Sequence, residues 1–192
     1  MNKTLLFFVT LLLLSVSGFG QQGPNPSTPV SCKLESLPRD VQTRLKQELD
    51  GWNIQQPENL TEHARARWKS EKPLECPGIA VGHFKSENLL SYAILLAQHS
   101  RPKGGYKLIV FNPQDDESSY QMEVLEESTD DDASNLFVHQ EPVGKFFDER
   151  SRKKFDVRAS EAILFADVGE KEYETDVYFW ARDGFQHQPI DY

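Results

Sequence analysis

Basic residues are few in this chain. Lys and Arg together number 21, against 30 Asp and Glu, and the formal net charge is −9 at pH 7. Nucleic acids and anionic lipid surfaces both favour a basic protein face, so this balance argues against either as the main partner. It is compatible with a solvated acidic surface or with a cationic protein partner.

Cysteine is also scarce, with Cys32 and Cys76 the two examples in the chain. They form no CxxC motif, and Pro29 stands where a lipoprotein signal has Leu, so we exclude both a redox site and lipidation of Cys32. In an oxidising compartment an isolated pair is most simply one disulfide. We therefore predict a Cys32–Cys76 bond, worth roughly 4 kcal/mol in the chain-entropy account of such a loop.

Long apolar runs are absent beyond residues 5–16. That run is too short to cross a bilayer comfortably, which takes about 20 residues. It follows a cationic start at Lys3 and precedes small residues at 17–20, an order typical of a secretory signal peptide. We predict cleavage of residues 1–20, a secreted or periplasmic location and no stable membrane insertion afterwards; an uncleaved anchor is the alternative.

The remaining chain has the length of one ordinary domain. Residues 21–31 contain three prolines and few apolar groups, so we expect a flexible mature N-terminus followed by a single domain over residues 32–192. Apolar residues recur every four positions from 37 to 49, which predicts a helix capped by Ser36. A second, shorter helix is expected over residues 61–70.

Strand patterns dominate the rest of the chain. Residues 89–98 are apolar on both faces, as expected of a central strand covered on both sides. Strands are predicted over residues 79–84, 89–98, 106–111, 120–125, 135–140, 162–166, 177–181 and 185–187. Helices early and strands later favour an α+β fold, with N-terminal helices packed on a mainly antiparallel sheet of about six to eight strands.

Motifs for catalysis are missing. The chain has no HExxH, no GxSxG and no glycine-rich phosphate loop, so we assign no catalytic residue and no cofactor. An active site assembled across strands would leave no local motif. Such a site would combine acids such as Glu87, Asp148 or Glu161 with His83 or His139.

Three short segments occur in a characteristic order: Gly-His-Phe at 82–84, Ser-Tyr-Ala at 91–93 and Tyr-Phe-Trp at 178–180. This order resembles an uncharacterised family of exported bacterial proteins whose strand–loop–strand is similar to one FG-GAP calcium loop. The resemblance implies export and a strand–loop–strand hairpin. Where such loops carry acids, this chain has His83 and Lys85, and calcium prefers several charged oxygens, so we expect a metal-free hairpin.

A weak second candidate for calcium has EF-hand spacing. Its oxygen-bearing side chains are Asp130, Asp132, Ser134 and Glu141. Asn135 stands where an EF-hand has Gly, and Pro142 blocks the exiting helix. An acidic surface turn is the simpler interpretation, and we expect no metal.

Residues 115–132 form an acidic run with no basic residue. The run presents a possible binding face for a cationic partner, whose members are Asp115, Asp116, Glu117, Asp130, Asp131 and Asp132. We prefer the interpretation that the basic run at 150–154 neutralises these acids within the fold, and no contact between the two runs is the alternative.

Aromatic residues gather near the C-terminus. They include Trp180 and Phe185, and we expect them, with Trp52, to lie in the core; an exposed aromatic groove is the alternative. Two functions remain open from the sequence. The first is a non-catalytic exported domain that binds another envelope or extracellular protein, and the second is an exported hydrolase. The sequence does not establish an enzyme, and the missing motifs favour binding.

Overall fold

The computed structural model describes residues 31–98, 104–114, 119–170 and 172–190. The predicted signal peptide (residues 1–20) lies outside these stretches, as do Asp115, Asp116 and Glu117 and nearly all of the predicted flexible N-terminus. The described stretches form three α-helices and nine strands, arranged in two antiparallel sheets.

Sheet A contains the first five strands. Its central strand, β3, pairs on one edge with β2 and β1 and on the other with β4, which pairs in turn with β5. These strands are β1 (Asn53–Ile54), β2 (Ile79–Ser86), β3 (Leu89–Ala97), β4 (Tyr106–Pro113) and β5 (Tyr120–Ser128). The central position of β3 confirms the strand predicted at 89–98.

Sheet B is a meander of the last four strands, each paired with the next. They are β6 (Leu136–Pro142), β7 (Glu161–Val168), β8 (Tyr173–Ala181) and β9 (Gly184–Ile190). A tight turn joins β8 to β9, in which Arg182 has a φ of 58°. The dipeptide Asp183-Gly184 predicted this hairpin.

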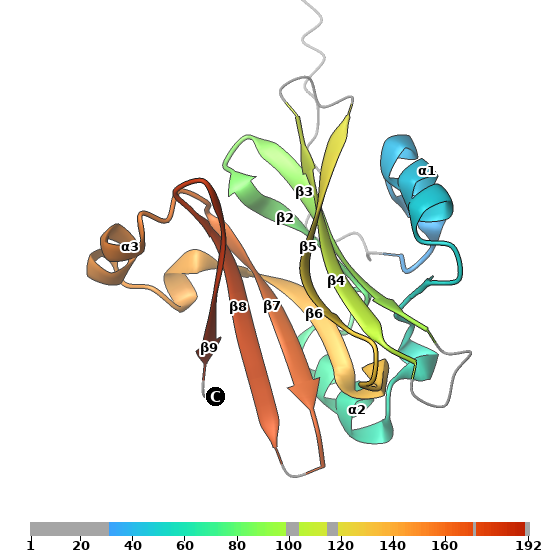
Figure 1. Ribbon diagram of the computed structural model, residues 1–192. Helices are drawn as coiled ribbons and strands as arrows, with labels where there is room; N and C mark the ends of the chain where they lie inside the picture. The colour runs from blue at the N-terminus through green and yellow to red at the C-terminus, as the bar shows by residue number, and fades with distance from the viewer. Residues whose placement is uncertain (1–30, 99–103, 115–118, 171, 191–192) are drawn as a thin grey trace, which may run out of the picture.

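The two sheets pack face to face, as in a sandwich (Figure 1). Alternation along each strand decides which side chains lie between them. On β3, Ala93 and Leu95 point into this inter-sheet core, whereas Ile94 and Leu96 belong to the opposite face. Phe84 and Phe165 contribute large aromatic side chains from opposite sheets.

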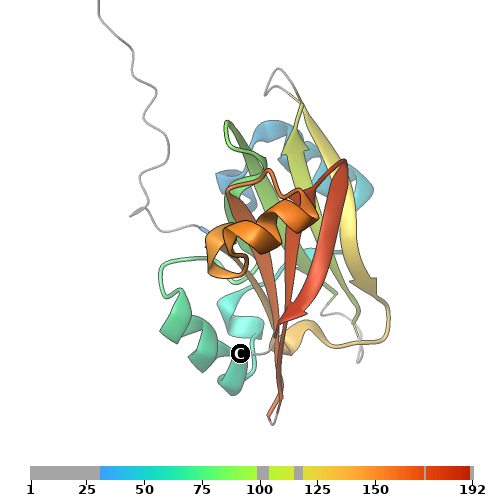
Figure 2. The same ribbon diagram turned by 90° about the vertical axis from the view of Figure 1, so that its left-hand side faces the viewer.

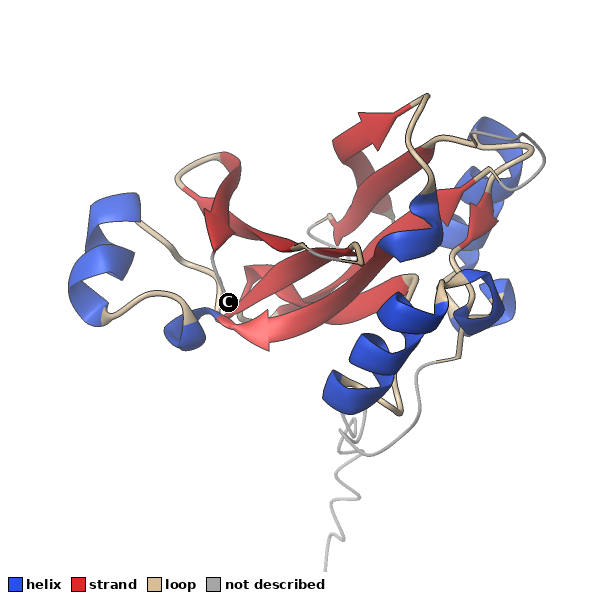
Figure 3. Ribbon diagram, turned by 90° about the horizontal axis from the view of Figure 1, so that it is seen from below, coloured by secondary structure: helices blue, strands red, loops and turns tan. Residues whose placement is uncertain are grey.

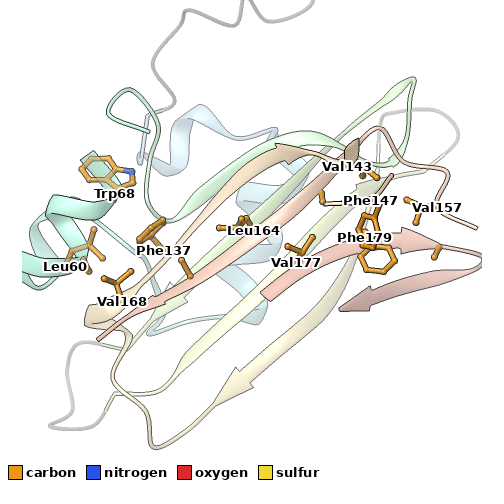
Figure 4. Close-up of a cluster of buried hydrophobic side chains, with 14 residues drawn as sticks. Leu60, Trp68, Phe137, Val143, Phe147, Val157, Leu164, Val168, Val177 and Phe179 are labelled. Carbon is orange, nitrogen blue, oxygen red and sulfur yellow. The ribbon is translucent and has the colours of Figure 1, made fainter. Parts of the chain in front are cut away.

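Helices cover both outer faces of the sandwich (Figures 1 and 2). α1 (Arg39–Glu48) buries Val41 and Leu45 against sheet A. α2 (Glu62–Glu71) buries Ala64 and Trp68 against sheet B (Figure 4), and α3 (Glu149–Phe155) lies farther along the same face (Figure 3). The order of layers is therefore helix, sheet A, sheet B, helices.

The prediction of helices on one sheet is wrong in two respects. The strands form two sheets, and the helices are divided between their outer faces. α3 was not predicted, because its seven residues are mostly charged and have no apolar repeat. Ser36 lies in a 3-10 turn (Leu34–Ser36) and does not cap α1, whose N-cap is Pro38.

Cys32 and Cys76 form a disulfide, with their sulfur atoms 2.10 Å apart, which confirms the predicted pair. The bond joins the segment before α1 to the segment after α2, and both sulfurs belong to the core between α1 and sheet A. No helix in the described stretches is long and apolar enough to cross a membrane.

Candidate functional site

Carboxylates from several segments gather at one end of the sandwich. This end holds the turn between β5 and β6 and the hairpin between β7 and β8 (Figure 1). We call this group the acidic face, and its members are Glu126, Asp130, Asp131, Asp132, Asp167 and Glu174. None of them makes an ion pair within the described stretches.

Four members of the acidic face, Glu126, Asp131, Asp167 and Glu174, lie close enough for their charges to interact unfavourably. The residue Asp167 is exposed as a whole, but its carboxyl is partly removed from water by neighbouring atoms. This desolvation, followed by the charges of Glu174, Asp131 and Glu126, raises the pKa of Asp167 above the usual range. A carboxyl with a raised pKa holds its proton more tightly because neighbouring negative charges disfavour ionisation. The face therefore has a negative field that the described part of the chain leaves uncompensated.

Glu126 also joins the two sheets. Its Oε1 accepts a hydrogen bond of 2.6 Å from the hydroxyl of Tyr106 in sheet A, and its Oε2 accepts one from Tyr178 in sheet B. Burial, followed by the hydrogen bonds to Glu126, raises the pKa of both tyrosines. The hydroxyls therefore remain donors throughout the physiological range.

The side chains with EF-hand spacing are not brought together. Asp132 caps the 3-10 turn Ala133–Asn135 by accepting from the backbone N–H of Ser134, whereas Glu141 lies near the far end of β6 among lysines. The described stretches contain no cluster of three or more His, Cys, Asp or Glu side chains able to hold a metal ion.

The basic run at residues 150–154 does not pair with the described part of the acidic run, residues 119–132. It forms most of α3, where Arg152 donates to the backbone carbonyls of Val157 and Ala159. The ion pairs of the described stretches include none between α3 and residues 119–132. α3 lies on the outer face of sheet B, away from β5 (Figure 1), so the expected internal pairing is not formed by residues 119–132.

His83 and Glu161, two of the residues considered for a hydrolase, meet at the rim of the inter-sheet core. Glu161 Oε2 accepts from the His83 backbone N–H at 2.5 Å and lies 3.2 Å from its Nδ1. Glu161 Oε1 accepts from the Gln140 side chain at 2.8 Å. Because Nδ1 faces the carboxylate, Nε2 is the imidazole nitrogen available to a substrate or water.

The other residues considered for a hydrolase lie elsewhere. Glu87 is exposed in the β2–β3 turn, and Asp148 caps α3 by accepting from the Ser151 backbone N–H at 2.7 Å, which lowers the pKa of Asp148. His139 is buried on the opposite face of sheet B, under α2, between Glu71 and Glu141. The sequence did not indicate Glu71 as a neighbour, since no local spacing relates a helix residue to a distant strand.

Aromatic residues near the C-terminus divide between core and rim. Tyr178 and Phe179 are buried, as predicted, but Trp180 is only partly buried and packs edge-to-face on Phe185, with ring centroids 5.2 Å apart. Lys85 lies 5.0 Å above the Trp180 ring. Trp180 and Trp52 are therefore at core margins, and the fully enclosed tryptophan is Trp68.

A cavity of about 790 Å³ opens beside the disulfide. Leu45, Ile54 and Leu96 contribute apolar lining, and Lys46 and Asp50 contribute charge. Its volume is in the range of small-molecule sites, but its mixed lining selects no chemical class.

Comparison with known protein families, with curated proteins and with solved structures finds no match to this chain. The candidate sites are therefore distinguished by their own geometry. The acidic face combines converging charge with exposure, whereas the His83–Glu161 pair combines a positioned imidazole with partial exposure.

Proposed function

We propose that this chain is an exported domain, secreted or periplasmic, that binds a cationic segment of another envelope or extracellular protein through the acidic face. The observation that carries the proposal is the convergence of exposed carboxylates from separate segments without a described cation among them. The predicted signal peptide and the Cys32–Cys76 disulfide support an oxidising compartment.

The energetics of the face favour a partner of opposite charge. Holding Asp131, Asp167 and Glu174 near Glu126 costs free energy in the isolated protein, because like charges repel. A Lys- or Arg-rich segment relieves this repulsion as it binds, and the field of the face also accelerates the encounter. We expect binding that weakens as salt is raised, since exposed charges are screened within about 10 Å at 0.1 M ionic strength.

The test is cross-linked affinity purification with the mature protein, using envelope and medium from the cells that produce it. A variant removes three charges from the acidic face: Asp131→Asn, Asp167→Asn and Glu174→Gln. We expect the wild type to retain a saturable partner and the variant to bind it at least tenfold less, with a melting temperature no lower than that of the wild type, because the substitutions relieve repulsion.

A matched control removes the same number of charges from exposed positions elsewhere: Glu35→Gln, Glu58→Gln and Glu62→Gln. This control should retain the partner as the wild type does. Equal recovery by the acidic-face variant and the wild type would contradict the proposal, as would recovery that is indifferent to salt.

A second candidate function is hydrolysis, which the His83–Glu161 pair favours. An imidazole held at Nδ1 by a carboxylate can act as a general base through Nε2 toward a water or a hydroxyl. His83→Gln should then abolish turnover of ester or glycoside substrates while preserving the fold. Absence of turnover by the wild type across both substrate classes would remove this candidate.

A further inference from the structure

His139 of β6 is enclosed between sheet B and α2, with only 2% of its surface exposed. Its ring stacks on Phe137, one strand repeat away, at a centroid distance of 5.9 Å. Phe137 faces the same cluster as Trp68 of α2, as Figure 4 shows. The imidazole therefore lies in the apolar contact that holds α2 on the sheet.

Carboxylates face both nitrogens of this imidazole. Nδ1 lies 3.5 Å from Glu141 Oε1, and Nε2 lies 3.7 Å from Glu71 Oε2. Within the described stretches neither nitrogen has a hydrogen bond. Glu71 belongs to α2 and Glu141 to β6, so His139 lies between a carboxylate of the helix and a carboxylate of the sheet.

The carboxylates around His139 already have cationic partners. Glu141 lies 3.6 Å from Lys72 and 3.1 Å from Lys145, and Glu71 lies 2.5 Å from Arg67. The charged and titratable groups on the elements that pack here are Arg67, Glu71 and Lys72 from α2 and its end, Glu75 after it, Glu141 from β6, Lys145 from the 3-10 turn Val143–Lys145, and Tyr173 from β8. Because these cations compensate the acids, a proton on His139 adds an unbalanced positive charge.

Neutral and protonated imidazole suit this site differently. The neutral ring has one N–H and one lone pair, so one of the two carboxylates faces a lone pair. The protonated ring would donate to both, but only if its charge were hydrated or otherwise compensated. Burial lowers the pKa of His139 to about 4, Lys72 and Lys145 act in the same direction, and Glu141 opposes them.

We propose that His139 is an acid-triggered switch whose protonation loosens α2 from sheet B. Opening this contact admits water to the imidazole and lets it take up a proton at its ordinary affinity. Acid therefore favours the open form, because that form binds the proton more tightly than the closed one. Burial of an uncharged histidine between carboxylates from a helix and a strand makes this contact sensitive to acid.

The sign follows from linkage. The pKa of His139 is about 4 in the closed fold, against 6.5 for a free histidine. The closed contact therefore keeps its full stability above pH 6.5 and loses it progressively as pH falls toward 4. At pH 5 the open population should rise roughly 30-fold relative to pH 7.5, if opening restores the free value.

The test is hydrogen exchange of the full mature protein at pH 7.5 and pH 5, expressed as protection factors corrected for intrinsic exchange. We expect α2 amides from Ala64 to Glu71 to lose roughly 20–30-fold in protection at pH 5. The β3 amides, Leu89–Ala97, should retain theirs. Loss of protection in α2 and β3 alike would overturn the proposal, because it would indicate global unfolding.

Two variants separate this histidine from other titrating groups. His139→Gln keeps a polar, uncharged side chain and should abolish the difference in α2 protection between the two pH values. His63→Gln, at an exposed position on the same helix, should preserve it. An unchanged pH effect in His139→Gln would overturn the proposal. If His139→Gln fails to fold, an NMR titration of wild-type His139 decides: a midpoint near 6.5 in the closed protein overturns it, and one near 4 supports it.

Discussion

The interface of sheet B with sheet A and its interface with α2 accommodate polar side chains differently. Toward sheet A, Glu126 and Glu161 lie at the rims, and each carboxylate oxygen accepts from a hydroxyl, an amide or an imidazole. Toward α2, His139 lies in the interior with carboxylates at 3.5 Å and 3.7 Å, and no described residue forms a hydrogen bond with either nitrogen. Hydrogen bonds therefore join sheet A to sheet B, whereas the contact between sheet B and α2 depends on His139 remaining uncharged.

This difference teaches that polar contacts in one sandwich can respond to pH in opposite directions. Tyr106 and Tyr178 are held neutral beside Glu126, so the inter-sheet contact is sensitive to alkali. His139 is held neutral by burial, so the α2 contact is sensitive to acid. A buried group stabilises the fold while it keeps the protonation state that its neighbours favour. That stabilisation is lost at pH values where the same group, exposed to solvent, would adopt the other protonation state.

The largest expected effect breaks the inter-sheet core. Phe84 is fully buried between the sheets, and Phe84→Ala should lower the free energy of unfolding by about 3–5 kcal/mol through lost burial and the cavity left behind. Urea unfolding measures this loss. Val124→Ala, at a residue 46% exposed on β5, is the control and should change stability by about 0.5 kcal/mol or less. Equal losses of stability in the two variants would contradict the conclusion that buried apolar side chains hold the two sheets together.

The next effect concerns the carboxylate that joins the sheets. Glu126→Ala should cost about 1–3 kcal/mol, because it leaves two partly buried hydroxyls without their acceptor. Glu127→Ala is the matched control: it removes an exposed neighbour paired with Lys107 and should cost less than about 1 kcal/mol. A Glu126→Ala variant as stable as its control would show that the hydroxyls find other acceptors.

Alkali should sharpen the contrast between the interfaces. The raised pKa of Tyr178 means that the fold retains a proton that the unfolded chain releases above about pH 10. The stabilisation from the neutral hydroxyl is therefore complete below pH 10 and is lost as pH rises beyond it. Tyr178→Phe should show a shallower decline in melting temperature between pH 9 and 11 than the wild type. An identical decline in melting temperature would show that a group other than Tyr178 causes the loss of stability in alkali.

The smallest expected effect is at the other rim. His83→Ala removes an imidazole that is 38% exposed but keeps the backbone N–H and the Gln140 amide that hold Glu161. We expect a loss of roughly 0–1 kcal/mol in thermal or urea unfolding. A loss as large as that of Phe84→Ala would mean that this rim, and not the apolar core, fixes the sheets together.

Local sequence patterns predicted the strands well and their assembly poorly. β3 was evident because residues 89–98 are apolar on both faces, and the β8–β9 hairpin because of Asp183-Gly184. The division into two sheets was not, since a continuous apolar run indicates that a strand is covered on both faces without identifying what covers them. Helix boundaries were near those observed, although Thr61, which accepts from the Ala64 backbone N–H, caps α2.

The candidate sites were predicted in part. The acidic turn at Asp131 was visible in the sequence, but its convergence with Asp167 and Glu174 depends on the pairing of β7 with β8. Likewise His83 and Glu161 were named separately, and their contact arises only when the two sheets stack. Local spacing reports neighbours along one element, whereas these contacts join elements far apart in the chain.

The disulfide has a consequence for how the molecule is made. Residues between Cys32 and Cys76 include α1 on one outer face and α2 on the other, so the closed ring spans the sandwich from side to side. Two cysteines allow only one intramolecular pairing, so oxidation cannot scramble within the chain. In the export that we propose, with the N-terminus emerging first, both sulfurs would reach the oxidising side before β2 through β9. The ring can therefore close first, and the strands that follow assemble between helices that are already tethered.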